Sequence, residues 1–294
     1  MIAQILDLPA ITSMVYILTP HLLTHRALSP QMSRSIEAQS KAGLIIQSMY
    51  RKLCETYRQS PLDTLDYLCH TEPLNIVFMP RALHPDAEQF DERFAFVGAS
   101  FNPQRDANLT PSVHDLLSGF PPDKADRPLL YISLGTLYNQ RPDFFRQCLR
   151  AFGSEDLRVI LSLGEGLRKE ELGPLPANIQ AASYVPQLEV LQRASAFITH
   201  GGANSVMEAF SFGVPIIVVP QNDEQTLTAT RVVELGLGCA LESANLSESV
   251  LHTAVSQVQQ PAIRATVSQM QTAVQAAGGA ERAAEIMLQH CLAL

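Results

Sequence analysis

The chain has 294 residues, of which 46% are hydrophobic and 17% charged, so it can build sizeable cores and is expected to be globular rather than disordered or fibrous. Its length favours two domains. The formal net charge of -8 argues against a nucleic-acid or anionic-membrane surface, because no Lys/Arg cluster is present to neutralise phosphates.

The apolar N-terminus lacks a basic region and is interrupted by Asp7 and Pro9, which favours a buried strand over a signal peptide. No segment approaches the roughly 18 apolar residues that a membrane span requires, so we expect none. The five cysteines lack CxxC spacing, which indicates neither a disulfide framework nor a zinc site. A reduced, cytoplasmic protein is the simplest interpretation.

The first hundred residues show few regular patterns. We predict a strand near residues 10–16, an amphipathic helix over 35–57, and short strands over 75–79 and 94–97. A stretch rich in Pro, Asp and Asn then predicts a linker. The expected organisation is a partial N-terminal domain over residues 1–103 and a linker over 104–127.

From residue 128 onward, short apolar runs alternate with helical patterns. The runs predict buried strands over residues 128–134, 157–163, 179–185, 196–199 and 215–219. Asp143 is expected to cap the helix after the first strand, and Gly153 to end it. The alternation predicts a doubly wound parallel sheet whose ligands bind beyond the carboxyl ends of the strands.

The tail predicts two further helices, over residues 262–276 and 280–291, with a glycine pair as the hinge. The second domain is therefore expected over residues 128–277. Residues 278–294 are expected to form a C-terminal helix that packs back toward the N-terminal domain.

The sharpest motif, HGGANSVMEA, follows the strand at 196–199. Gly201 and Gly202 permit a sharp turn and bring a ligand close to the main chain, where the N–H groups of the next helix carry partial positive charge. His200 can donate to a phosphate oxygen. These features predict a phosphate site that needs no lysine.

The helix after this turn offers further polar groups. Asn204 and Ser205 can donate from its first turn, and Glu208 shares a helix face with Asn204, so its carboxylate can accept from ribose hydroxyls. The alternative is structural: Ser205 and Glu208 also match a capping box, and the glycines match a plain turn.

Two other strand ends carry polar residues. Ser133, Gly135 and Thr136 follow the first strand of the second domain, and Glu224 and Gln225 follow the strand at 215–219. The first group suits phosphate, and the second suits the adjacent hydroxyls of a sugar. An ordinary turn and an acid-rich helix N-terminus are the alternatives.

The segment SYVPQLEVLQRASAFITHGGANSVMEAFSFGVPIIVVPQNDEQ resembles the donor-binding signature of UDP-dependent glycosyltransferases, especially the bacterial macrolide type and its plant secondary-product relatives. The resemblance continues through YISLGT, LNIVFMPRALHP and FAFVGAS. It implies an α/β protein of the GT-B fold, with two Rossmann-like domains of which the N-terminal one is incomplete.

The resemblance also assigns roles along the signature. It implies that residues 184–187 border the nucleobase, that the HGGANS segment and the YISLGT loop hold the diphosphate, and that the later acidic residues hold ribose and sugar. The implied donor-binding residues are Ser133, Gly135, Thr136, Tyr184, Val185, Gln187, His200, Gly201, Gly202, Asn204, Ser205, Glu208, Glu224 and Gln225.

The activity implied is transfer of a hexose from a nucleotide sugar, UDP-linked by resemblance, to a hydroxyl of a lipophilic small molecule with inversion. The nucleotide sugar is a co-substrate, and neither a metal nor another cofactor is expected. In the family, a histidine in an early loop, oriented by an aspartate, serves as general base. The chain is expected to start after both, and we assign no base among His21, His25 and His84.

The alternative from another class is a truncated or non-catalytic nucleotide-sugar-binding protein. An incomplete sheet exposes an unpaired edge, which favours self-association. A lipid-linked sugar transferase or a nucleotide-sugar epimerase shares the glycine-rich turn, but the VPQ and HGGANS segments fit such enzymes less well.

Overall fold

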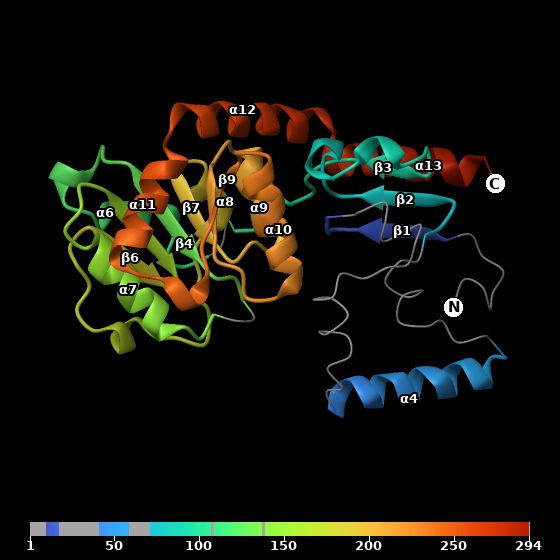
Figure 1. Cartoon of the computed structure of the whole chain (residues 1–294), viewed down its shortest axis with the longest axis horizontal. Helices are drawn as coiled ribbons and strands as arrows, with labels where there is room; N and C mark the ends of the chain where they lie inside the picture. The colour runs from blue at the N-terminus through green and yellow to red at the C-terminus, as the bar shows by residue number, and fades with distance from the viewer. Residues whose placement is uncertain (1–9, 18–40, 59–70, 107–108, 137–138, 294) are drawn as a thin grey trace. The chain divides into compact units, whose positions relative to one another are not determined.

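The computed structural model describes residues 10–17, 41–58, 71–106, 109–136 and 139–293 (Figure 1). The chain divides into two compact units, Met1–Val97 with Glu281–Leu294, and Gly98–Ala280. Each unit contains a parallel sheet. Among the described residues, no helix is both long enough and apolar enough to cross a membrane.

The first unit contains a sheet of three described strands in the order β1-β2-β3. Leu74, Ile76 and Val97 form its small core together with Ala283, and Ile286 packs against them from the C-terminal helix. The elements are β1 (Ile11–Met14), α4 (Lys41–Thr56), β2 (Leu74–Val77), η1 (Arg81–Leu83), η2 (Ala87–Gln89), β3 (Phe94–Phe96) and α13 (Gly279–Leu292).

The second unit contains a six-stranded sheet in the order β6-β5-β4-β7-β8-β9, with every neighbouring pair parallel. The first strand in sequence, β4, therefore lies in the middle, and the chain builds outward from it in both directions. The strands are β4 (Leu129–Ser133), β5 (Arg158–Ser162), β6 (Ile179–Ala182), β7 (Ala196–Thr199), β8 (Ile216–Val218) and β9 (Gly238–Ala240).

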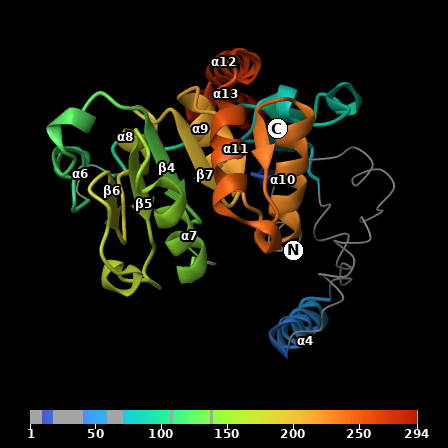
Figure 2. The ribbon, with the colours of Figure 1, turned by 60° about the vertical axis from the view of Figure 1, so that its left-hand side comes forward.

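Helices cover both faces of this sheet (Figure 2). Helices α7 and α11 pack against each other on one face, and α9 packs against α8 and α12. The helices and short 3-10 turns are α6 (Val113–Ser118), η3 (Pro122–Lys124), α7 (Pro142–Phe152), η4 (Lys169–Leu172), α8 (Gln187–Leu191), α9 (Ala203–Ser211), α10 (Asp223–Glu234), η5 (Ser243–Asn245), α11 (Glu248–Val258) and α12 (Pro261–Ala276).

Alternation along β4 assigns its side chains to the two faces of the sheet. Leu130 and Ile132 join the core that includes Phe145 and Phe152 of α7, all of them almost fully buried. Burying each such ring contributes about 1.5–3 kcal/mol relative to leaving it exposed. Tyr131 points to the opposite face, where its ring stacks on Phe197 of β7 with centroids 4.7 Å apart. Side chains on both faces of the sheet are therefore buried, as a run of apolar strands predicts.

The predicted strands of the second unit are all present, with two differences from the expected local structure. The strand expected over 179–185 ends at Ala182, so Tyr184 and Val185 lie in the loop that follows. Asp143 does not cap α7: the N-cap is Arg141, and Pro142 occupies the first helical turn. Proline suits that position because its missing N–H has no partner there.

The stretch over 104–127, for which the sequence predicts a linker, contains α6. Ser112 and Asp115 form a capping box at its start, with Oγ of Ser112 accepting from the backbone N–H of Asp115 at 3.2 Å. Val113, Leu116 and Phe120 are buried. Three apolar side chains in a short segment were too few to predict this helix from periodicity.

Candidate functional site

Three loops that follow β4, β7 and β8 enclose a cavity of about 210 Å³. The strand order reverses between β4 and β7, because β5 and β6 lie beyond β4 while β8 and β9 lie beyond β7. In open α/β sheets, ligands bind outside the carboxyl ends of the strands at such a reversal. The cavity is lined by Leu134, Thr136, His200, Gly202, Asn222, Glu224 and Gln225.

The imidazole of His200 is held between two glycines. A Cβ on Gly135 would lie 2.6 Å from Cε1 of His200, and a Cβ on Gly202 would overlap Nε2. Gly135 also has a φ of +78°, a conformation that other residues rarely adopt. Both glycines are therefore needed to admit the ring.

His200 is also electrostatically unusual. Burial lowers its pKa, which favours the neutral imidazole near pH 7. Its Nδ1 is buried and has no hydrogen-bond partner in the described part of the chain. A neutral imidazole offers one N–H donor and one acceptor nitrogen, so the ring can still serve a ligand in the cavity.

Gly201 makes the turn between β7 and α9. It has a φ of +87°, and its N–H donates to Oγ1 of Thr199 at 3.3 Å. Helix α9 then begins with Gly202 as its N-cap and no side-chain cap. The first-turn N–H groups thus remain available beside the cavity, where their partial positive charge favours an anion. Asn204 is exposed on this first turn.

The capping box considered for Ser205 and Glu208 is not formed. The N-cap is Gly202, so Ser205 is already inside the helix and Glu208 lies in its second turn. Glu208 is 2% exposed and makes other contacts. The capping-box alternative for Glu208 is therefore wrong.

The loop after β8 leads into α10. Oδ1 of Asn222 caps this helix by accepting from the backbone N–H of Gln225 at 2.9 Å. The side-chain oxygen of Gln225 accepts from the backbone N–H of Gln221 at 2.7 Å. Glu224 is exposed in the first turn, at the edge of the cavity. Helix capping and a cavity lining are thus combined in the same few residues.

The residues of the loop after β4 have different roles at the cavity. Ser133 is buried, and its Oγ accepts from the backbone N–H of Gly135 at 3.3 Å, so it shapes the loop. The amide of Asn139 donates to the carbonyl of Gly135 at 2.9 Å and supports the same turn. Thr136 is exposed and lines the cavity.

Glu208 lies in a polar cluster separate from the lining of this cavity. Nη1 of Arg105 donates to its Oε1 at 2.7 Å, and Nη2 of Arg105 donates to its Oε2 at 3.1 Å. The amide nitrogen of Gln187 also donates to Oε2, at 2.6 Å, and lies 3.3 Å from Oγ of Ser205. The structure therefore brings Gln187, Ser205 and Glu208 together with Arg105 in one hydrogen-bonded cluster.

Tyr131 and Asp106 complete the cluster. The hydroxyl of Tyr131 donates to the side-chain oxygen of Gln187 at 3.0 Å, which turns the amide nitrogen toward Glu208. Asp106 accepts from Nε of Arg105 at 2.9 Å and from the backbone N–H of Leu188 at 3.2 Å. The sequence patterns missed Arg105, Asp106 and Tyr131. The only signal was indirect: a carboxylate inside a helix that packs on a sheet requires a cation.

The two remaining signature residues lie outside the cavity lining. Tyr184 is 42% exposed, and its hydroxyl donates to Oε1 of Glu165 at 2.6 Å. This hydrogen bond to Glu165 raises the pKa of Tyr184. Val185 is buried.

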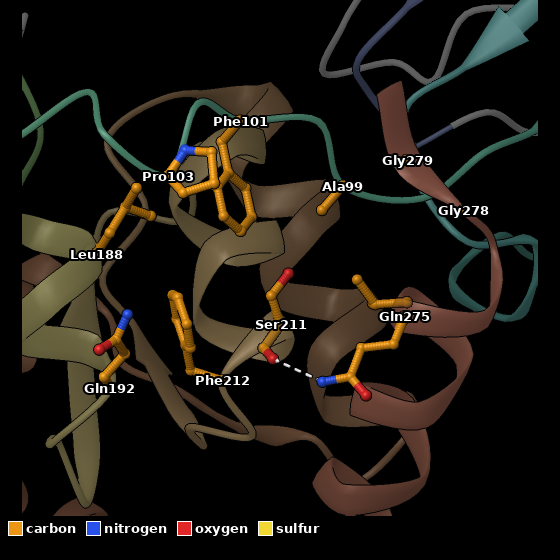
Figure 3. A pocket seen from close by; sticks show the side chains of 11 residues that line it. Ala99, Phe101, Pro103, Leu188, Gln192, Ser211, Phe212, Gln275, Gly278 and Gly279 are labelled. Atoms are coloured by element: carbon orange, nitrogen blue, oxygen red, sulfur yellow. Dashed lines mark hydrogen bonds between the residues drawn. The ribbon is translucent and has the colours of Figure 1, made fainter. Parts of the chain in front are cut away.

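A second, larger cavity of about 380 Å³ occurs in the same unit (Figure 3). The side chains of Phe101, Leu188 and Phe212 line it, and the two rings lie 6.1 Å apart. Its polar residues include Gln275, whose amide donates to the carbonyl of Ser211 at 3.4 Å. This mostly apolar lining does not offer the convergent donors that a diphosphate requires.

Of the three histidines weighed as a base, His84 lies within the described residues. His84 is buried, with its ring edge-on to Phe96 at 4.9 Å and near Phe90 at 6.2 Å, in an aromatic cluster. His21 and His25 lie outside the described residues.

Residues 146–289 match the family described as erythromycin biosynthesis protein CIII-like, C-terminal domain. NDP-glycosyltransferase YjiC of Bacillus subtilis (strain 168) is 45% identical over 225 residues, which cover 76% of this chain and 55% of that protein. Demethyllactenocin mycarosyltransferase of Streptomyces fradiae is 35% identical over 213 residues, covering 72% and 44% respectively. The chain thus spans about half the length of these relatives.

Among solved structures, that of CalG4, the calicheamicin glycosyltransferase, is similar with a TM-score of 0.76 and 34% identity, covering 98% of this chain and 70% of that one. This likeness and the parallel sheets of both units confirm the predicted GT-B fold class. The chain belongs to the NDP- and UDP-dependent glycosyltransferase family that includes the macrolide glycosyltransferases.

Proposed function

We propose that this chain binds the nucleotide sugar in a glycosyltransferase that transfers a hexose from a UDP-sugar to a hydroxyl of a lipophilic small molecule with inversion. The observation that carries the proposal is the cavity at the strand-order reversal, where residues from three strand ends converge. The similarity to a calicheamicin glycosyltransferase and to a mycarosyltransferase supports a small-molecule acceptor.

The diphosphate would bind at the start of α9. Uncapped N–H groups after Gly202, the imidazole of His200 and the hydroxyl of Thr136 supply neutral donors there. As the bond to the sugar breaks, negative charge develops on the departing diphosphate, and fixed donors stabilise it more than they stabilise the ground state. This arrangement needs no lysine at the phosphates.

The sugar would lie toward the loop after β8. Glu224 offers an exposed carboxylate and Gln225 a side-chain amide, which suit two adjacent hydroxyls. Glu208 would hold the ribose, and Tyr184, Val185 and Gln187 would border the base. Deprotonation of the acceptor hydroxyl requires a general base, and we assign that role to none of the described residues.

We also propose a cytoplasmic location. The thiols of Cys148, Cys239 and Cys291 form no disulfide, which suits a reducing compartment.

Isothermal titration of the full chain with UDP, UDP-glucose and dTDP tests the donor assignment. UDP and UDP-glucose are expected to bind, and His200→Ala to weaken both about tenfold or more, the loss of one strong hydrogen bond. The matched control is His252→Ala, a partly exposed histidine of α11 that does not line the cavity, and this variant should bind like the wild type. A folded chain that binds none of the three ligands would refute the donor site.

Release of UDP from UDP-glucose, with and without apolar phenols as acceptors, tests the transfer step in the same samples. Acceptor-dependent release supports transfer to a lipophilic hydroxyl. Binding without release would instead identify a nucleotide-sugar-binding protein. Tighter binding of dTDP than of UDP would overturn the assignment of uracil as the base.

A further inference from the structure

The bidentate contact between Arg105 and Glu208 joins a partly exposed side chain to a buried one. The side chain of Glu208 is 2% exposed, whereas that of Arg105 is 41% exposed. The guanidinium therefore covers the carboxylate on its solvent side. Burying a carboxylate without a hydrogen-bonded partner costs free energy, so a donor group has to face Glu208 at the position that the guanidinium occupies.

Arg105 has a second anchor that does not depend on Glu208. Its Nε lies 2.9 Å from Oδ1 of Asp106, and Asp106 is itself fixed by the backbone N–H of Leu188 at 3.2 Å. The guanidinium can thus leave Glu208 and still keep one carboxylate partner and contact with water. The pKa of Arg105 is raised, mainly by its hydrogen bond to Glu208. An arginine also stays charged without such a partner, so Arg105 is a cation in either position.

The contact also uses the geometry that a ribose would use. Two N–H groups of Arg105 reach the two oxygens of Glu208, and two adjacent hydroxyls can donate to a carboxylate in the same paired way. A carboxylate has about four acceptor positions. Arg105 occupies two of them on Glu208 and Gln187 occupies another at Oε2, so two ribose hydroxyls cannot be added while the guanidinium is bound. Either the guanidinium or the ribose can bind, but not both.

We propose that Arg105 is a displaceable counter-ion at the ribose subsite, and that nucleotide binding exchanges its guanidinium for the two ribose hydroxyls on Glu208. This inference rests on the proposed function. It makes Arg105 a residue that limits nucleotide affinity, and it makes the exchange depend on both hydroxyls. A nucleotide without them leaves Arg105 in place.

The test is titration of the full chain with UDP and with 2′,3′-dideoxy-UDP, comparing the wild type with Arg105→Gln. Removing the competitor is expected to tighten UDP binding about tenfold and to leave 2′,3′-dideoxy-UDP binding unchanged. Arg150→Gln is the matched control, since Arg150 pairs with Glu248 on the surface and both are more than half exposed. It should change neither affinity.

Arg105→Lys keeps the charge but loses the bidentate geometry. A smaller gain in UDP affinity is expected, and this variant tests the inference if Arg105→Gln does not fold by circular dichroism. Unchanged or weaker UDP binding in the variants, with a wild type that binds, overturns the inference and leaves the proposed donor site standing. An equal gain for 2′,3′-dideoxy-UDP also overturns it. Failure of the wild type and every variant to bind UDP refutes both.

Discussion

Gly202 and His200 lie so close together that a Cβ atom on Gly202 would overlap Nε2 of the imidazole. The φ of Gly202 is −63°, an ordinary value, so the need for glycine at this position is steric rather than conformational. Gly202 is also the N-cap of α9. The same residue thus admits the ring and starts the helix.

Gly202→Ala is expected to move the imidazole of His200 and to lower UDP affinity about tenfold, the effect of losing one strong hydrogen bond. We expect little change in melting temperature. Gly119→Ala is the control, because Gly119 also has a negative φ and its added Cβ would meet only the flexible end of Gln180. Titration calorimetry and thermal unfolding separate the two effects. Equal UDP affinity in Gly202→Ala and the wild type would contradict the role given to His200.

Asn222→Ala is expected to reduce the unfolding free energy by about 1 kcal/mol, the usual contribution of a helix N-cap. It should also weaken UDP-glucose binding, because Asn222 lines the cavity. Ser247→Ala removes the equivalent cap of α11, where Oγ accepts from the backbone N–H of Val250 at 3.2 Å. It should destabilise similarly and leave affinity intact. If both variants lose affinity alike, the loss reflects stability alone.

Tyr131→Phe keeps the ring that stacks on Phe197 but removes the hydroxyl that orients Gln187. We expect a loss of about 1 kcal/mol in unfolding free energy, the typical net value of one hydrogen bond, measured by urea denaturation. UDP affinity should also fall, because the Gln187 amide can then rotate. Tyr57→Phe, at an exposed position, should change neither quantity. Wild-type stability of Tyr131→Phe would argue against the orienting bond.

The lowered pKa of His200 predicts a pH dependence of stability. Because burial lowers this pKa below its ordinary value of 6.5, the unfolded chain binds more protons than the folded chain below that pH. The stabilising contribution of neutral His200 is therefore complete above about pH 6.5 and lost as the pH falls. Urea midpoints at pH 7.5 and 5.5 should differ less in His200→Gln than in the wild type, and equal differences would refute this.

Much of the second unit could be predicted because its signals are local. The run AFIT is bounded by a polar residue before it and by His200 after it, and β7 has the predicted bounds Ala196–Thr199. The strand ends at Thr136, His200 and Glu224 line one cavity because parallel strands bring their carboxyl ends to one edge of the sheet. Periodicity and turn residues are sufficient for inferences of this kind.

The cluster around Glu208 could not be predicted because its partners are remote in sequence. Arg105 belongs to a stretch without apolar periodicity, and 103 residues separate it from Glu208 in the sequence. Asp143 shows the opposite limit, since Pro142 takes the first helical turn and displaces the expected cap. Two local rules compete at this helix start, and the preference of proline for the first turn prevails.

The central place of β4 in the second sheet has a consequence for folding. Its pairing with β7 joins segments that are far apart in the chain, and such contacts form late because the intervening loop must first lose conformational entropy. The cavity between Thr136 and Glu224 cannot exist before that pairing. The capacity to bind a nucleotide should accordingly appear in the last phase of refolding, so that a ligand reports completion of the native state rather than its nucleus.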